Sequence, residues 1–181
     1  TSRRDGTIRV WDPPPGKLLR TLQGHEGYVY DVALSPQGDL LASSGRDAII
    51  RLWDLAEGKV IRTMEGHTDI VRGIAFSPDQ KALASVSVDQ SVRLWDVASG
   101  KLKKTLAGHT ARVKSIVYSP DGKWIATAAS DRTIRVWATD NGEGFAELQG
   151  HTRDLETLAL SRHGRVLAGR RVWRWGRWGG C

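Results

Sequence analysis

The sequence predicts an all-β protein assembled from copies of one four-stranded antiparallel sheet. Two markers recur with a common period of 42 residues along the 181-residue chain, a Gly-His pair and a tryptophan. The histidines are His25, His67, His109 and His151, and the tryptophans are Trp11, Trp53, Trp95 and Trp137. Because both markers keep the same period, a single structural unit is repeated along the chain.

The first predicted strand of each unit covers residues 29–34, 71–76 and 113–118, where side chains alternate between two faces. In the first of these segments the larger face comprises Tyr30, Val32 and Leu34, and the other face comprises Val29, Asp31 and Ala33. The small residues Gly73, Ala75 and Ser115 in the later copies should let a neighbouring sheet approach closely.

Turns of the Ser-Pro type at 35–38, 77–80 and 119–122 should reverse the chain into a second strand at 40–44, 82–86 and 124–128. An aspartate follows each second strand, and a third strand covers 50–53, 92–95 and 134–137. A Gly-Lys turn then leads to a fourth strand. One such sheet has two apolar faces and cannot bury both, so the copies must stack on one another.

Taken together, the Gly-His and Trp-Asp markers, the Ser-Pro-Asp-Gly turn and the loop aspartate resemble the WD-repeat (Trp-Asp repeat) β-propeller family. The resemblance covers residues 5 to about 168. It implies that each sheet, or blade, is held by four hydrogen-bonded side chains, here called the structural staple. The matching residues are His25, Ser43, Asp47 and Trp53; His67, Ser85, Asp89 and Trp95; and His109, Thr127, Asp131 and Trp137.

Each staple contains a hydroxyl, a histidine and an aspartate, which also suggests the alternative of a hydrolase triad. A nucleophile needs a hydroxyl that is exposed and free to attack, whereas these hydroxyls should face an indole N–H inside a packed blade. The histidines lie in separate blades without metal-ligand spacing. We therefore interpret the staples as structural and expect no catalytic residue, metal or cofactor.

The pattern predicts an incomplete propeller arc of three full blades and two half-blades. The expected divisions are a half-blade at 1–26, blades at 27–66, 67–108 and 109–150, and a half-blade at 151–168. Thr1 aligns with Ser43 and Asp5 with Asp47, so the first unit begins in mid-blade. Because the family usually closes with more blades, we expect a fragment of a larger propeller that self-associates through exposed apolar faces.

Residues 169–181 form an aberrant Arg/Trp/Gly tail. Its arginines supply more than half of the net charge of +7, so the rest of the chain gives no strong nucleic-acid signal. The tail is interpreted either as a patch for nucleic acid or a membrane surface, or as the product of a shifted reading frame. We favour the second, because the pattern breaks inside a strand. Without a membrane span or signal peptide, and with Cys181 as the lone cysteine, a cytoplasmic location is expected.

The resemblance implies a non-catalytic scaffold that binds protein or peptide partners on the narrow propeller face, rather than a small-molecule substrate or a membrane. The residues expected there are Tyr28, Tyr30, Arg46, Ile70, Arg72, Val88, Arg112, Lys114 and Ser130, with solvated loop ends as the simpler alternative for each. The basic residues favour an acidic or phosphorylated partner, and Asp154 and Glu156 are expected at the far end of the arc. The alternatives are a sensor or targeting module of a larger multidomain signalling enzyme and nucleic-acid binding through the tail.

Overall fold

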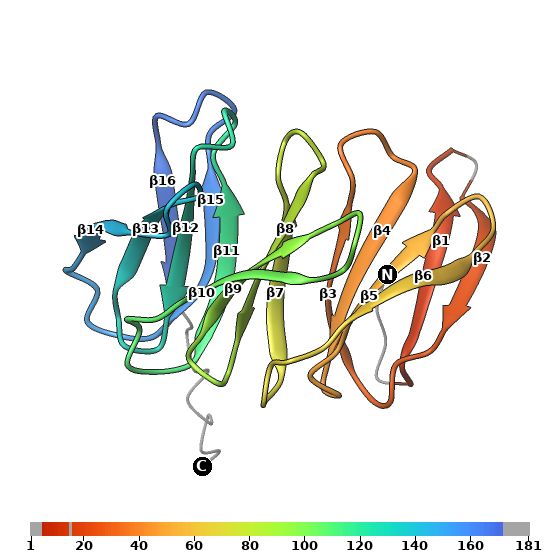
Figure 1. The fold of residues 1–181 in the computed structure, drawn as a ribbon, viewed down its shortest axis with the longest axis horizontal. Coiled ribbons are helices and arrows are strands. Elements are labelled where there is room, and N and C mark those ends of the chain that lie inside the picture. Colours follow the sequence, from red (N-terminus) through yellow and green to blue (C-terminus); the bar gives the residue numbers. More distant parts are fainter. Residues whose placement is uncertain (1–4, 15, 172–181) are drawn as a thin grey trace, which may run out of the picture.

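The computed structural model describes residues 5–14 and 16–171. Within these residues the chain forms sixteen strands and no helix, and hence no helix long and apolar enough to cross a membrane. The strands make five antiparallel sheets that stand side by side in an open arc, with β1–β2 at one end and β15–β16 at the other (Figure 1). The predicted all-β class, with four-stranded blades in an incomplete arc, is confirmed.

Each complete blade follows the chain order, so neighbouring strands are joined by short turns. Blade 1 contains β3 (Val29–Leu34), β4 (Leu40–Gly45), β5 (Ile50–Asp54) and β6 (Lys59–Met64). Blade 2 contains β7 (Val71–Phe76), β8 (Ala82–Ser87), β9 (Val92–Asp96) and β10 (Leu102–Leu106). Blade 3 contains β11 (Val113–Tyr118), β12 (Trp124–Ala129), β13 (Ile134–Ala138) and β14 (Gly144–Leu148).

The two remaining sheets are half-blades. The N-terminal half-blade contains β1 (Thr7–Asp12) and β2 (Lys17–Gln23), and the C-terminal half-blade contains β15 (Leu155–Leu160) and β16 (Leu167–Arg171). Strand β16 runs three residues beyond Ala168, where the pattern predicted an end, because Gly169 and Arg170 still pair with β15. Thr1, Pro15 and residues 172–181, which include most of the predicted tail and Cys181, lie outside the described residues.

The hydrophobic core lies between the blades, as the two apolar faces of each sheet require. One cluster joins Ile50, Leu52 and Met64 of blade 1 to Ile74, Phe76 and Trp95 of blade 2. Another joins Val86 and Leu94 of blade 2 to Ile116 and Trp137 of blade 3. Stacking therefore buries surfaces that a single sheet would leave in water.

A bulge at the start of each first strand changes the predicted faces. In β3 the pairing slips between Val29 and Asp31, and Val29 then packs with Val32 and Trp53. Ala33 packs on the opposite side, against the cluster between blades 1 and 2. The expectation that Val29 shares a face with Ala33 is therefore wrong, because the extra residue of a bulge interrupts strict alternation.

Candidate functional site

The residues predicted to bind partners lie where each first strand begins and each second strand ends. These two strands are antiparallel, so both positions fall at the same edge of the blade. Main-chain hydrogen bonds join them there, from Arg46 to Tyr28 at 2.8 Å, from Val88 to Ile70 at 2.9 Å and from Ser130 to Arg112 at 2.9 Å. We call this edge the rim. Its members are the predicted partner residues, Tyr28, Tyr30, Arg46, Ile70, Arg72, Val88, Arg112, Lys114 and Ser130.

Four equivalent positions on the first strands form a row that crosses the blades. Its members, which we call the cross-blade row, are Tyr30, Arg72, Lys114 and Glu156, on β3, β7, β11 and β15. The guanidinium carbon of Arg72 lies 4.8 Å from the centre of the Tyr30 ring, within range of a cation–π contact. The rings of Tyr28 and Tyr30 stack with centres 6.3 Å apart. The aromatic side chains thereby hold Arg72 in place.

Carboxylates face the basic members of this row. Arg72 Nη2 lies 3.5 Å from Glu156 Oε2, and Lys114 contacts both Glu156 and Asp154, the latter at 3.4 Å. Glu156 on β15 and Asp154 just before it belong to the half-blade at the far end of the arc, and their carboxylates nevertheless contact basic residues of the rim. The curvature of the arc brings the first strands of successive blades together, so that Glu156 of β15 reaches Arg72 of β7 across the intervening strand β11.

Two surface cavities adjoin the cross-blade row. One, of about 290 Å³, is lined by Tyr30, Asp31, Arg72, Gly73, Lys114, Ser115, Ile116, Glu156 and Thr157. The other, of about 620 Å³, is lined by Lys114, Ser130, Arg132, Thr152, Arg153, Asp154 and Glu156. Lys114 and Glu156 belong to both cavities. The row thus provides polar hollows at the rim that are large enough for one or two side chains of a partner.

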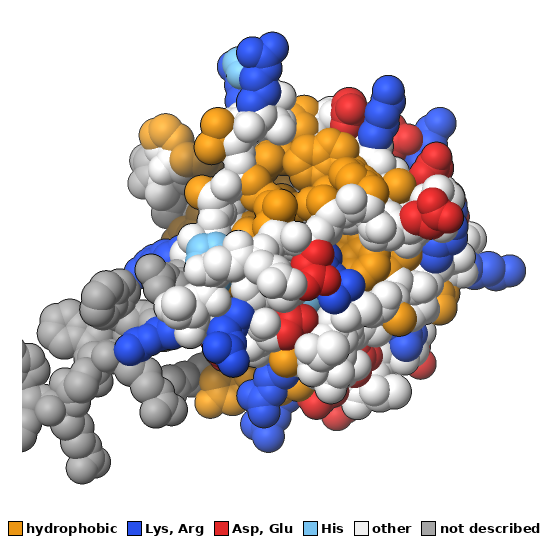
Figure 2. Space-filling model, turned by 90° about the vertical axis from the view of Figure 1, so that its left-hand side faces the viewer, with side chains coloured by type: hydrophobic (Ala, Val, Ile, Leu, Met, Phe, Trp, Pro, Cys, Tyr) orange, Lys and Arg blue, Asp and Glu red, His pale blue; other side chains and the backbone are white. Residues whose placement is uncertain are grey.

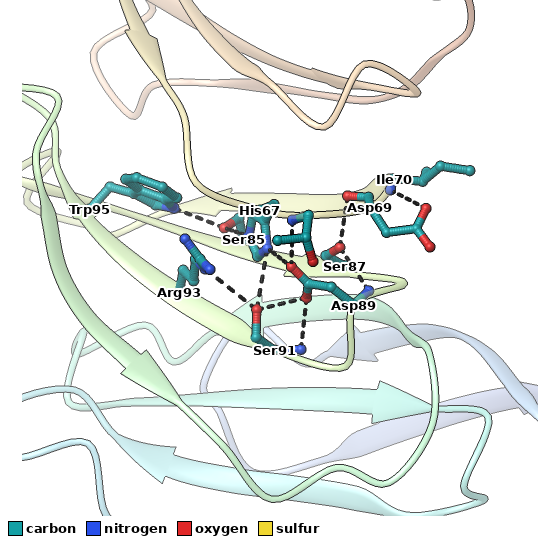
Figure 3. A network of polar contacts seen from close by, with 10 residues as sticks. His67, Asp69, Ile70, Ser85, Ser87, Asp89, Ser91, Arg93 and Trp95 are labelled. Atoms are coloured by element: carbon teal, nitrogen blue, oxygen red, sulfur yellow. Dashed lines mark hydrogen bonds and ion pairs between the residues drawn. The ribbon is translucent and has the colours of Figure 1, made fainter.

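The four residues of each predicted staple lie together inside their blade, and Figure 3 shows those of blade 2. In blade 2, Ser85 Oγ lies 2.8 Å from His67 Nε2 and accepts a hydrogen bond from Trp95 Nε1 at 2.8 Å. The other imidazole nitrogen, Nδ1, lies 2.8 Å from Asp89 Oδ2. These contacts fit an imidazole tautomer in which Nδ1 donates to the carboxylate and Nε2 accepts the hydrogen bond of the serine hydroxyl.

The other two blades repeat this geometry. Ser43 Oγ lies 2.7 Å from His25 Nε2 and 2.8 Å from Trp53 Nε1. Thr127 Oγ1 lies 2.8 Å from both His109 Nε2 and Trp137 Nε1. All three hydroxyl residues are fully buried, so a substrate in solvent has no path to them.

Opposing effects set the pKa of the staple aspartates. Burial alone would raise the pKa of the Asp47 carboxyl, but hydrogen bonds from His25 and Arg51 and the positive charge of Arg51 hold it well below its usual range. Burial would likewise raise the pKa of the Asp89 carboxyl, but hydrogen bonds from His67 and Ser91 bring this pKa well below its usual value. These carboxylates are therefore ionised at neutral pH.

Partners of the staples that the sequence prediction omitted lie on the third strands or immediately before them. Arg51 Nη1 contacts Asp47 Oδ2 at 2.6 Å, and in blade 2 the hydroxyl of Ser91 donates to Asp89 at 2.7 Å. Arg93 lies over the Trp95 ring, and a Cβ added to Gly66 of the Gly-His pair would collide with Arg93. A repeat signal for these arginines exists in the sequence, because they recur with the 42-residue period.

No group of three or more His, Cys, Asp or Glu side chains among the described residues is arranged to hold a metal ion.

Three segments of the chain, residues 16–54, 58–96 and 100–138, match the family described as WD domain, G-beta repeat. Each segment runs from the last strand of one sheet to the third strand of the next. Together the three segments cover well over half of the chain.

Curated proteins are similar to shorter stretches. Nuclear distribution protein PAC1 of Mycosarcoma maydis is 49% identical over 43 residues, which are 24% of this chain and 10% of that protein. The PAC1 protein of Arthroderma benhamiae is 47% identical over 45 residues, 25% of this chain and 10% of its own length. WD repeat and SOCS box-containing protein 1 of Homo sapiens is 41% identical over 46 residues, 25% and 11% of the two chains. The chain thus spans about a tenth of the length of these relatives.

Proposed function

The chain belongs to the WD-repeat family, and on that basis we propose that it is a non-catalytic scaffold that binds protein or peptide partners on its rim. Repeats of this family generally mediate protein–protein interaction. The observation that carries the proposal is the stack of Arg72 on Tyr30 beside the cavity of about 290 Å³. Arginine and tyrosine side chains held in place beside a hollow are typical anchors of protein interfaces.

The burial of the staples supports the non-catalytic part of this proposal. Ser43, Ser85 and Thr127 are fully buried, and each hydroxyl is engaged by an indole N–H and an imidazole nitrogen. A hydroxyl in this position holds strands together and cannot reach a substrate carbonyl.

The partner in this proposal is an acidic or phosphorylated peptide. Arg72 and Lys114 are both directed at the Glu156 carboxylate, so their side chains already adopt an arrangement that receives an anion. Arg46 and Arg112 are exposed on the same rim and add positive charge. A carboxylate or phosphate of the partner would take the place of Glu156 between the two cations.

Titration calorimetry on the 181-residue chain tests this function. The probe is a synthetic peptide with one phosphothreonine among acidic residues, and a lysine-rich peptide of equal length serves as the control ligand. Binding of the phosphopeptide should weaken as salt rises, and Arg72→Glu should weaken it more than Lys59→Glu, at an exposed position near the turn before β6. Equal losses in the two variants would mean that bulk charge alone attracts the peptide and that the rim is not its site.

A second candidate function is a sensor or targeting module within a larger signalling protein. It is favoured by the matched relatives, which carry similar repeats in chains of which this one spans about a tenth. The coding sequence on both sides of the region for these 181 residues tests it. A catalytic domain in the same reading frame would support this candidate, and its absence would sink it.

A further inference from the structure

A surface cavity of about 280 Å³ lies between blades 2 and 3. Its lining includes Ala82, Lys103, Lys104, Tyr118, Thr139 and Asp140. Tyr118 ends β11 and Ala82 begins β8, so the cavity lies at the edge of the blades opposite to the rim. Hydrophobic side chains also gather on the C-terminal end of the arc (Figure 2), whereas the lining of this cavity belongs entirely to two complete blades.

The same positions between blades 1 and 2 hold larger or less polar side chains. The pairs that the 42-residue period relates are Leu40 and Ala82, Phe76 and Tyr118, and Val97 and Thr139. Phe76 and Val97 are buried in one hydrophobic cluster, against which Leu40 packs. Between blades 2 and 3, alanine in place of leucine removes packing volume, and tyrosine and threonine add two hydroxyls. The cavity therefore accompanies substitutions that are specific to this junction.

One of these two hydroxyls has no partner in the part of the chain that the structure describes. Thr139 Oγ1 donates to the main-chain oxygen of Gly122 at 2.7 Å. The Tyr118 hydroxyl makes no hydrogen bond to another described residue, although its side chain is half-buried. Burial and the nearby charge of Asp79 raise the pKa of the Tyr118 phenol, so the group stays protonated. Tyr118 therefore offers the cavity a neutral hydrogen-bond donor, which suits a carbonyl oxygen.

Positive charge predominates in the lining of the cavity. Lys103 Nζ lies 3.9 Å from Asp96 Oδ2, which is too far for a hydrogen bond, and the Lys103 side chain is 54% exposed. Lys104 Nζ donates to the main-chain oxygen of Asp140 at 3.2 Å. These two lysines outnumber the one carboxylate of the lining, that of Asp140. Lys103 can therefore pair with a carboxylate of a partner.

We propose that this cavity is a second docking site, which binds an extended peptide with a leucine followed by acidic residues. The leucine side chain takes the place that Leu40 has between blades 1 and 2. The Tyr118 hydroxyl donates to a main-chain carbonyl of the peptide, and Lys103 pairs with the carboxylate that follows. An aliphatic group, a carbonyl oxygen and a carboxylate in close succession are features of an extended peptide. The site does not depend on peptide binding at the rim.

Fluorescence anisotropy with the 181-residue chain tests the proposal. The probe is a labelled synthetic peptide of glycine and serine that carries one leucine followed by two glutamates. One control peptide has alanine in place of the leucine, and the other has lysines in place of the glutamates. The parent chain should bind the probe saturably and the alanine control at least about tenfold more weakly, because a buried aliphatic group is lost. Failure of the probe to bind, or equal binding of either control peptide, would overturn the proposal.

Two substitutions convert the cavity to the residues that the junction between blades 1 and 2 already has. Ala82→Leu should weaken binding of the probe at least about tenfold, because the new side chain occupies the place of the peptide leucine. Tyr118→Phe should weaken it about two- to tenfold through the loss of one hydrogen bond. Circular dichroism checks the fold of both variants, and Tyr118→Phe decides if Ala82→Leu does not fold. Unchanged affinity in a folded variant of either kind would overturn the proposal.

A charge-matched pair of variants separates the cavity from the rim. Lys103→Ile and Arg72→Gln each remove one positive charge, the first at the cavity and the second at the rim. Lys103→Ile should weaken binding of the leucine probe and flatten its salt dependence, whereas Arg72→Gln should leave both nearly unchanged. Ala82→Leu should leave binding of the phosphothreonine peptide unchanged, so the two sites can fail independently. Equal losses of the leucine probe in Lys103→Ile and Arg72→Gln would overturn the proposal.

Discussion

The Asp31 carboxylate accepts a hydrogen bond from the main-chain N–H of Ile74 at 2.9 Å and so ties β3 of blade 1 to β7 of blade 2. Ser115 Oγ makes the corresponding contact with the N–H of Leu158 at 3.0 Å, from blade 3 to the C-terminal half-blade. Between blades 2 and 3 the equivalent residue is Gly73, which has no side chain to make it. The ties between blades are therefore unequal along the arc.

The stability of the Asp31→Asn variant relative to the parent should increase as pH rises. Burial raises the pKa of the Asp31 carboxyl, and hydrogen bonds from Ile74 and Val32 oppose this only in part. A raised folded pKa means that this group's contribution to stability is complete below the unfolded value of about 3.9 and is lost as pH rises through the folded value. Asparagine keeps an acceptor oxygen for Ile74 without the charge.

Thermal melts of parent and Asp31→Asn between pH 3.5 and pH 7.5 measure this difference. The melting temperature of the variant relative to the parent should climb across the interval above about 3.9 and then level off. Asp79→Asn is a control at an exposed turn, where hydrogen bonds from Ser77 and Lys81 lower the pKa, so its melting temperature relative to the parent should stay level above about 3.9. A difference for Asp31→Asn that is constant with pH would contradict the prediction.

His67→Ala should destabilise the protein by about 1–3 kcal/mol at neutral pH. The substitution removes the imidazole between Ser85 and Asp89 and leaves a buried hydroxyl and a largely buried carboxylate without that partner. The measurement is the free energy of unfolding in urea, with His163→Ala at an exposed turn as the control. If the urea unfolding curve of His67→Ala superimposed on that of the parent, the structural role assigned to the staples would be wrong.

Ser44→Ala should stabilise the protein by about 1 kcal/mol. Ser44 is fully buried and its hydroxyl has no hydrogen-bond partner, whereas the equivalent residues Val86 and Ala128 are apolar. The adjacent Ser43→Ala is the matched control, because its hydroxyl is bonded to His25 and Trp53 and its loss should be destabilising. In urea unfolding, the free energy of unfolding should rise for Ser44→Ala and fall for Ser43→Ala. A loss of stability in both variants would contradict the conclusion that the Ser44 hydroxyl has no hydrogen-bond partner.

The sequence predicts most of the contacts that recur inside each blade. It predicts few of the contacts between blades, which depend on the curvature of the arc. His67, Ser85 and Trp95 could be grouped in advance because contacts inside one blade recur at fixed offsets. The contact of Glu156 with Arg72 could not be predicted from the sequence. It joins strands of separate blades and depends on the angle between successive sheets.

Local backbone geometry accounts for the other differences. The bulge at Val29 adds a residue to one strand without any marker residue, so simple alternation assigned the wrong face. Strand β16 continues past Ala168 because pairing with β15 needs main-chain groups rather than the motif residues, which are missing there. Motif loss is therefore a poor guide to where a paired strand ends.

Glu156→Gln should strengthen binding of the phosphothreonine peptide about two- to fivefold, the range expected for releasing half-exposed ion pairs. In the parent, the Glu156 carboxylate already contacts Arg72 and Lys114, so an incoming anion must displace it. The amide retains the shape of the side chain and removes its charge. Glu57→Gln is the matched control, since Glu57 pairs with Lys59 at a turn outside the rim and its charge change is identical. Titration calorimetry at low and high salt should show a gain for Glu156→Gln that shrinks as salt rises, because screening weakens both the internal pair and the peptide contact. If Glu57→Gln gives the same gain, net charge accounts for the effect and Glu156 does not compete with the peptide.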